Sequence, residues 1–138
     1  MKNNIDNKII IGRRIRVNLP DFGLENLEAK IDTGAYRGAI HCHNVHEENG
    51  RLYFTLLDPE HEYYDEQEFC TPLYKKISVR SSNGNSEERY CVTLDIEISD
   101  KTIPIELSLT NRSDMRYPVL IGRRSLKKHF LIDPSKIN

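Results

Sequence analysis

Two groups of side chains between Glu28 and His43, in the stretch "EAKIDTGAYRGAIHCH", have the chemistry of a catalytic or metal site. Asp32 ends an apolar run and offers a carboxylate that could activate water as a general base. His41 and His43 flank Cys42, and on a strand both histidines would share one face, where they could bind a metal ion. The third interpretation is an ordinary strand that ends in an aspartate-led turn.

The residues of the triplet Asp32-Thr33-Gly34 suit a structural role as well as a chemical one. Apolar residues before Asp32 carry the strand into a core, the Thr33 hydroxyl can fix a neighbouring loop, and Gly34 lets another backbone approach closely. Three residues alone are a weak signal. A second segment of interest is "YPVLIGRRSL", an apolar strand that runs into Gly122 and then into a short helical stretch.

The elements that must position these residues are mostly strands. Apolar and polar residues alternate in "CVTLDIEIS" and, after a two-residue turn, in "TIPIELSLT", which predicts a β-hairpin with one buried face. Pro104 lacks an N–H and is expected at an edge or at a position without a ladder hydrogen bond. Further strands are expected at 14–20, 27–32 and 52–57, and one short helix within 122–130. The fold class is therefore mainly β, of the barrel or sandwich type.

Length and composition restrict the classes of function. The chain has 138 residues, which suits a single domain spanning 1–138, and its net charge of −1 does not favour nucleic acid or an anionic membrane as partner. There is no apolar run of signal-peptide or membrane-spanning length. The three widely spaced cysteines, Cys42, Cys70 and Cys91, form no CxxC pair and are expected as reduced thiols in a cytoplasmic protein.

The Asp-Thr-Gly triplet and the later Leu-Ile-Gly strand with its helix resemble the retropepsin-like aspartic proteases. The segments "KIDTGAYRGAIH", "VRSSNG", "IELSLTNRSDMRYPVLIGRRSL" and "FLIDPS" resemble more closely the family named as ATP-dependent zinc proteases, whose members are often associated with RimK-type ATP-grasp ligases. The resemblance extends from about Gly12 to Ser135. It implies a retropepsin-like closed barrel with one short C-terminal helix, in which Leu120-Ile121-Gly122 supports the Asp-Thr-Gly loop.

The resemblance also implies an aspartic-type peptidase that hydrolyses peptide amide bonds with two carboxylates. Because the chain holds one Asp-Thr-Gly, the second aspartate has to come from another copy, which predicts a homodimer. A glycine-tipped hairpin at 78–90 corresponds to the flap that covers substrate, and an acidic insertion lies around 46–74. The expected catalytic residues are Asp32, Thr33 and Gly34, and the expected substrate-binding residues are Ala35, Arg80, Asn83, Gly84, Arg112 and Arg123.

The association with glutamate-adding ligases suggests a glutamate-rich protein tail as substrate and a RimK-type ligase as partner. Arginine binds carboxylates with two parallel hydrogen bonds, so Arg80, Arg112, Arg116 and Arg123 are the expected anion-binding side chains. Where retroviral enzymes have an acidic residue after the triplet, this chain has Ala35-Tyr36-Arg37. Arg123 therefore lacks its usual partner, and we expect it to pair elsewhere, for example with Asp133, or to meet substrate.

Two alternatives from other classes remain. One is a peptide-binding module of the same fold in which Asp32 is inert. The other is a zinc-dependent hydrolase that uses His41 and His43, although no HExxH and no distant Cys/His pair supplies the remaining ligands. No GxxxxGK[ST] loop is present, so ATP is expected to act through the partner ligase. We expect no cofactor and assign no metal ligand. The sequence leaves the substrate, the pH optimum and the strength of the dimer open.

Overall fold

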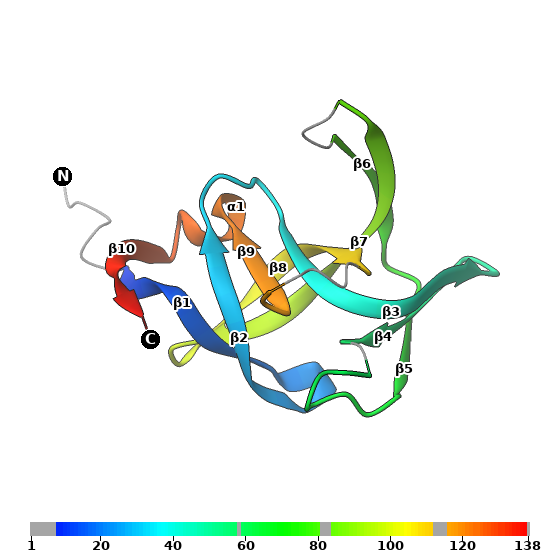
Figure 1. Ribbon diagram of the computed structural model, residues 1–138, viewed down its shortest axis with the longest axis horizontal. Helices are drawn as coiled ribbons and strands as arrows, with labels where there is room; N and C mark the ends of the chain where they lie inside the picture. The colour runs from blue at the N-terminus through cyan, green and yellow to red at the C-terminus, as the bar shows by residue number, and fades with distance from the viewer. Residues whose placement is uncertain (1–7, 58, 81–83, 112–115, 138) are drawn as a thin grey trace.

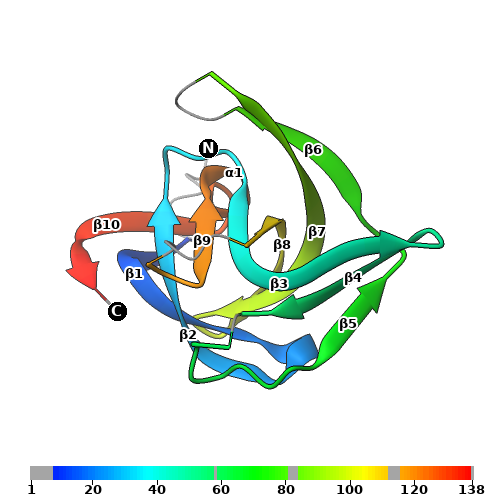
Figure 2. The ribbon, with the colours of Figure 1, turned by 45° about the vertical axis from the view of Figure 1, so that its right-hand side comes forward.

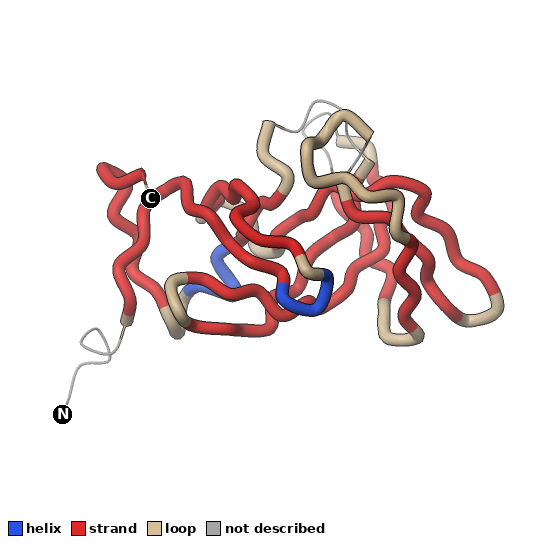
Figure 3. The backbone as a smooth tube through the Cα atoms, turned by 90° about the horizontal axis from the view of Figure 1, so that it is seen from below, coloured by secondary structure: helices blue, strands red, loops and turns tan. Residues whose placement is uncertain are grey.

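The computed structural model describes residues 8–57, 59–80, 84–111 and 116–137, and strands dominate them (Figures 1 and 3). The mainly β class is confirmed. In chain order the elements are β1 (Ile9–Leu19), the 3-10 turn η2 (Pro20–Phe22), β2 (Leu24–Asp32), β3 (Gly38–Glu48), β4 (Arg51–Leu56), β5 (Glu68–Thr71), β6 (Lys75–Arg80), β7 (Ser86–Ile98), β8 (Lys101–Thr110), β9 (Val119–Gly122), α1 (Arg123–Leu126) and β10 (Phe130–Ile137).

Six strands form a closed ring. The pairing order runs β1-β2-β9-β3-β8-β7, and β7 returns to β1 where Asn18 pairs with Glu97. Closure leaves these strands without a free edge over the paired stretches. β10 continues the sheet beyond β1 and β6 continues it beyond β7. The predicted retropepsin-like closed barrel with one short helix is confirmed.

The interior of the barrel is filled by the apolar half of each alternating strand. In β7 and β8 the register pairs Val92 with Leu107 and Ile96 with Ile103, and all four side chains are buried in one continuous core cluster. The predicted hairpin is therefore confirmed. Pro104 lies opposite Asp95, outside the stretch of β8 that pairs with β3, so its missing N–H interrupts no described ladder on that side.

The two motif segments lie side by side. β2 and β9 are parallel, and their register pairs Ile31 with Ile121 and Asp32 with Gly122. In Figure 1 the two strands end at the same end of the barrel, where α1 follows β9. The predicted contact between Asp32-Thr33-Gly34 and Leu120-Ile121-Gly122 thus follows directly from the sheet register.

The segment around 46–74 extends the fold rather than forming a loose loop. β3 continues past the barrel and pairs with β4, and β4 pairs with β5, so the three strands make a curved arm that projects from the barrel (Figure 2). The side chains of Leu52, Phe54 and Leu56 belong to the same core cluster as the barrel strands. That the chain is one domain over 1–138 stays a prediction.

The C-terminal part differs in detail from the sequence expectation. The helix predicted within 122–130 has only four residues, Arg123–Leu126, because the chain turns at Lys127–His129 and enters β10. β10, which contains Pro134, was not among the strands expected from the sequence. It pairs in parallel with β1 at one end of the sheet, where proline is tolerated. No helix in the described part of the chain is long and apolar enough to cross a membrane.

Candidate active site

Asp32 occupies the last position of β2, where the strand leaves the barrel and turns. Its side chain is half-buried. Its Oδ1 accepts a hydrogen bond from the backbone N–H of Gly34 over 3.1 Å, and its backbone carbonyl accepts one from Ala35 over 3.2 Å. These two bonds fix the carboxylate at the start of a tight turn and leave its second oxygen available to a ligand or to another carboxylate.

The turn after Asp32 is held by the connection from β9 into α1. The backbone N–H of Arg123 donates to the carbonyl of Ala35 over 2.8 Å, and that of Arg124 donates to Tyr36 over 3.2 Å. Gly122 makes the approach close enough: a Cβ there would lie 2.6 Å from the carbonyl carbon of Arg37. Atoms at that separation overlap, so only glycine fits without a shift of the backbone.

The ring of Tyr36 is a partner of Arg123 in this chain, where retroviral enzymes use an acidic residue as the partner of the corresponding arginine. The guanidinium groups of Arg37, Arg123 and Arg124 each lie 5.5 Å from the centre of the Tyr36 ring, within cation–π distance. Arg123 also donates from Nη1 to the carbonyl of Gly34 over 3.1 Å. Arg123 therefore stabilises the Asp32 loop through a ring and a carbonyl rather than through a carboxylate.

The expected ion pair between Arg123 and Asp133 is wrong. Asp133 instead accepts hydrogen bonds from the backbone N–H of Ser135 over 3.0 Å and from its hydroxyl over 2.6 Å. The hydroxyl bond and then the backbone bond lower the pKa of Asp133. The reason is local: an aspartate two residues before a serine closes its own turn along β10, and this contact needs no partner from elsewhere.

A cavity of about 400 Å³ lies between the Asp32 loop and the β6–β7 hairpin, and we call it the Asp32 pocket. Figure 1 shows the hairpin extending past the barrel at the end where β2 delivers the loop. The wall residues used below are Asp32, Ala35, Tyr36, Arg37, Arg80 and Arg89. The structure thus brings the hairpin that was expected as the flap, which β6 and β7 form by pairing from Lys75 to Cys91, to the same cavity as Asp32.

The positions of the other expected site residues differ. Ala35 and Arg80 line the Asp32 pocket. Gly84 lies at the far end of the hairpin with a φ of +89°, a conformation that favours glycine, and it is exposed. Asn83 and Arg112 lie outside the described residues. Arg123 bonds the carbonyl of Gly34 in the Asp32 loop and is not among the residues that line the pocket.

Arg89 is a candidate site residue that the sequence did not single out. It lines the Asp32 pocket from β7, and only 15% of its side chain is exposed. One guanidinium nitrogen lies 3.5 Å from the exposed carboxylate of Glu87, while its buried Nε has no hydrogen-bond partner among the described residues. The register of the β6–β7 hairpin pairs Arg89 with Ile77, and both residues line the pocket, a relation that the sequence alone does not show.

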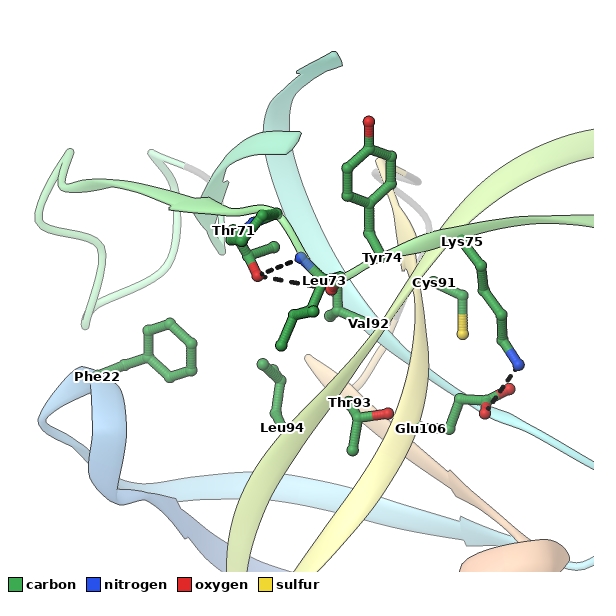
Figure 4. A pocket seen from close by; sticks show the side chains of 11 residues that line it. Phe22, Thr71, Leu73, Tyr74, Lys75, Cys91, Val92, Thr93, Leu94 and Glu106 are labelled. Carbon is green, nitrogen blue, oxygen red and sulfur yellow. Dashed lines mark hydrogen bonds and ion pairs between the residues drawn. The ribbon is translucent and has the colours of Figure 1, made fainter. Parts of the chain in front are cut away.

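A second unexpected feature is the carboxylate of Glu106 on β8, which three cations share. Arg37 bonds one of its oxygens, and Lys75 and Arg124 approach the other at 3.2 and 3.1 Å. Burial raises the pKa of Glu106, but the bonds to Arg37 and Lys75 outweigh burial and leave this pKa below its ordinary value of 4.5. Figure 4 shows the Lys75–Glu106 contact at one end of a cavity of about 590 Å³, whose other end is apolar and contains Phe22 and Leu94.

The histidine segment does not have the form of a zinc site. His41 and Cys42 are buried, and burial raises the pKa of the Cys42 thiol. His43 packs edge-on to Tyr64, with ring centres 6.4 Å apart, and His46 stacks on the Tyr53 ring at 5.1 Å. Within the described ranges, no three His, Cys, Asp or Glu side chains come together in a way that would hold a metal ion. The residues present do not fit the zinc ion that the resemblance implies.

A closed barrel with an Asp-Thr-Gly loop supported by a parallel Ile-Gly strand defines the retropepsin-like class of fold. The chain belongs to the RimB-like family, described as retropepsin-like aspartic endopeptidase RimB, whose model matches residues 10–138. This agrees with the resemblance drawn from the motifs.

Curated relatives and a solved structure extend the comparison. The chain is 32% identical over 139 residues to a protein of Shewanella pealeana named "Probable alpha-L-glutamate ligase", and 31% identical over 131 residues to one of the same name from Parasynechococcus marenigrum. It spans only 30% and 28% of the length of these two relatives. A crystal structure of a Legionella pneumophila protein of unknown function matches with a TM-score of 0.71 and 30% identity, covering 93% of this chain and 95% of the other.

Proposed function

We propose that this protein is an aspartic-type peptidase in which Asp32 and the same residue of a second copy form the catalytic pair. The observation that carries the proposal is the position of Asp32, whose carboxylate is held by the Gly34 N–H and which lines a pocket shared with the β6–β7 hairpin. Two adjacent carboxylates share one proton, because ionising both at short distance is costly. The charged one takes a proton from water, and the protonated one donates to the amide carbonyl as the water attacks.

The need for a second copy follows from the chain itself. Its sequence contains one Asp-Thr-Gly. Two aspartates of the same chain could in principle serve as the partner of Asp32. The carboxylate of Asp133 already accepts hydrogen bonds from Ser135, and Asp114 lies outside the described residues. Thr33 is exposed beside Asp32, where it can reach the loop of a partner copy. A homodimer about a two-fold axis supplies both carboxylates from identical loops.

We further propose that the substrate is an acidic peptide, such as a glutamate-rich protein tail added by a RimK-type ligase in the cytoplasm. Arg80 and Arg89 line the Asp32 pocket. Arg37 also lines it, but its guanidinium is engaged by Glu106. The buried Nε of Arg89 is a donor that a substrate carboxylate would satisfy. Curated relatives named as glutamate ligases support an association with that chemistry.

The test is a cleavage assay on glutamate-tailed and neutral peptides with the wild type and Asp32→Asn. Asparagine keeps the Oδ1 acceptor for the Gly34 N–H but cannot share a proton, so cleavage should fall by orders of magnitude while the melting temperature stays nearly unchanged. Cleavage that survives the substitution and is abolished by a chelator would favour the zinc hydrolase instead.

A peptide-binding module is the second candidate, and one observation favours it. β6 is the last strand of the sheet, and its outer edge pairs with no strand in the described part of the chain. An extended peptide could add to that edge through backbone hydrogen bonds. Tight peptide binding by wild type and Asp32→Asn alike, with no cleavage by either, would support this candidate over the peptidase.

A further inference from the structure

A third cavity, of about 520 Å³, adjoins the Asp32 pocket at Tyr36. Tyr36 lines both cavities, so they are neighbours. The third cavity is formed mainly by α1 and the turn that follows it, together with Pro104 and Glu106 of β8. We call it the α1 groove; its lining residues from the helix and turn are Arg124, Ser125, Lys127, Lys128 and His129.

The α1 groove carries excess positive charge. Its one lining carboxylate, Glu106, is already shared by Arg37, Lys75 and Arg124. Lys127 and Lys128 are exposed, and among the residues that the structure describes no carboxylate lies within ion-pair distance of either ammonium. The groove therefore holds two cations whose charge no carboxylate of the described residues neutralises.

His129 at the edge of the α1 groove responds to the same charge. Burial lowers the pKa of its imidazole, and the nearby ammonium groups of Lys101 and Lys128 lower it further. Glu106 also lines the groove but is engaged by its own cations. The His129 ring thus lies close to positive charge, and an anion that binds in the groove should change the environment of this ring measurably.

We propose that the α1 groove is a remote subsite that binds side-chain carboxylates of an acidic peptide whose scissile bond lies in the Asp32 pocket. This proposal rests on the peptidase function proposed above. It adds the place where the substrate's glutamates that lie away from the scissile bond are bound. Tyr36 lines both the Asp32 pocket and the α1 groove, so one extended substrate peptide would cross this residue to occupy both sites. We propose an acidic peptide rather than nucleic acid because the groove shares Tyr36 with the pocket in which a peptide amide would be cleaved.

Charge reversal tests the groove with a matched control. Lys127→Glu and Lys128→Glu alter the groove, whereas Lys136→Glu makes the same change at an exposed position on β10. For a peptide with five consecutive glutamates, each groove variant should raise KM about fivefold, the size of one exposed charge pair, with kcat nearly unchanged. A peptide with a single glutamate beside the scissile bond should be cleaved equally by all four proteins. Unchanged KM for the five-glutamate peptide in both groove variants would overturn the proposal while leaving the peptidase function intact.

A binding measurement separates the subsite from catalysis. In Asp32→Asn, pentaglutamate should shift the NMR resonances of the His129 ring, and the shift should be lost in the Asp32→Asn/Lys128→Glu protein but kept in Asp32→Asn/Lys136→Glu. This pattern together with absence of cleavage by the wild type would refute the peptidase, and with it the scissile bond in the Asp32 pocket, while supporting the groove as a binding site for acidic peptide. If a single-stranded oligonucleotide produces the same shift at the same concentration, the groove binds any polyanion and the proposal for an acidic peptide is wrong.

Discussion

Gly122 and Arg37 lie in direct backbone contact, although one ends β9 and the other belongs to the loop that follows Asp32. A Cβ on Gly122 would lie 2.6 Å from the carbonyl carbon and 2.7 Å from the carbonyl oxygen of Arg37. Because β2 and β9 are parallel neighbours at this point, the contact fixes the loop relative to the barrel. The glycine is therefore a structural requirement of the candidate active site.

Gly122→Ala should destabilise the fold by about 3 kcal/mol, because neither the backbone of Arg37 nor that of Tyr36 can move aside cheaply. Thermal unfolding measures this effect. The matched control is Gly34→Ala, since a Cβ there meets only Asp32 Oδ1 at 3.4 Å, an ordinary contact, and the melting temperature should hardly change. Equal stability of the two variants would mean that the loop does not depend on the contact with β9.

Excess Asp32→Asn protein should poison wild-type cleavage. If the pair of carboxylates forms between two copies, most wild-type chains then sit in mixed dimers that hold a single aspartate. For a weak dimer, cleavage by wild type alone should also rise faster than linearly with enzyme concentration. Both effects are read from initial rates across a dilution series. Constant specific activity in the mixture, together with sedimentation as a monomer at every concentration, would rule out the shared pair.

Glu106→Gln should cost stability at neutral pH but not in acid. The pKa of Glu106 is lower in the folded protein than its ordinary value of 4.5, so its ionised form stabilises the fold above that pH, and the contribution is lost as the pH falls through the folded pKa. We expect the variant to be less stable by about 1 kcal/mol at pH 7, and the difference to shrink as the pH falls below 4.5, by denaturant titration across this range. Glu28→Gln, at a surface pair with Arg16, is the control and should be nearly neutral at every pH. A difference that stays constant as the pH is lowered would contradict the charge-based explanation.

Arg89→Gln should reduce the preference for glutamate over glutamine next to the scissile bond. The substitution removes the charge from the wall of the Asp32 pocket but costs little stability, since the buried Nε has no partner among the described residues to lose. The ratio of kcat/KM for the glutamyl and glutaminyl peptides should fall about tenfold, with partial recovery in Arg89→Lys, which keeps charge without the planar fork. A purely structural role would instead lower both kcat/KM values together and reduce the melting temperature.

Sequence patterns and motifs were enough to predict some features of the tertiary structure. The alternation in β7 and β8 fixed which side chains are buried, because a strand exposes every second residue to each face. The contact between Asp32 and the Leu-Ile-Gly strand followed from the resemblance of two motifs to a known fold. The extent of β10 did not follow, since Pro134 argues against a strand in a local view, and only its place at the end of the sheet makes it acceptable.

Charges that converge from distant strands could not be predicted from the sequence. Arg37 and Glu106 are 69 positions apart, and Lys75 and Arg124 reach the same carboxylate from two further elements. The sequence offers many surface cations and carboxylates at similar local spacing. Which of them meet depends on sheet order and register, because side-chain pairing across a sheet is set by its neighbours rather than by position in the chain.

By itself, the sequence determined the β class, the buried face of the central hairpin and the identity of Asp32 as the candidate catalytic carboxylate. These features depend on local periodicity and on a short motif, both of which can be read from the amino-acid sequence alone. Only the tertiary structure decided that Tyr36 replaces a carboxylate as the partner of Arg123, that Arg89 lines the Asp32 pocket and that Lys127 and Lys128 line a groove beside it. The physical reason is that each of these relations joins segments brought together by the parallel β2–β9 pairing and by the closure of the barrel.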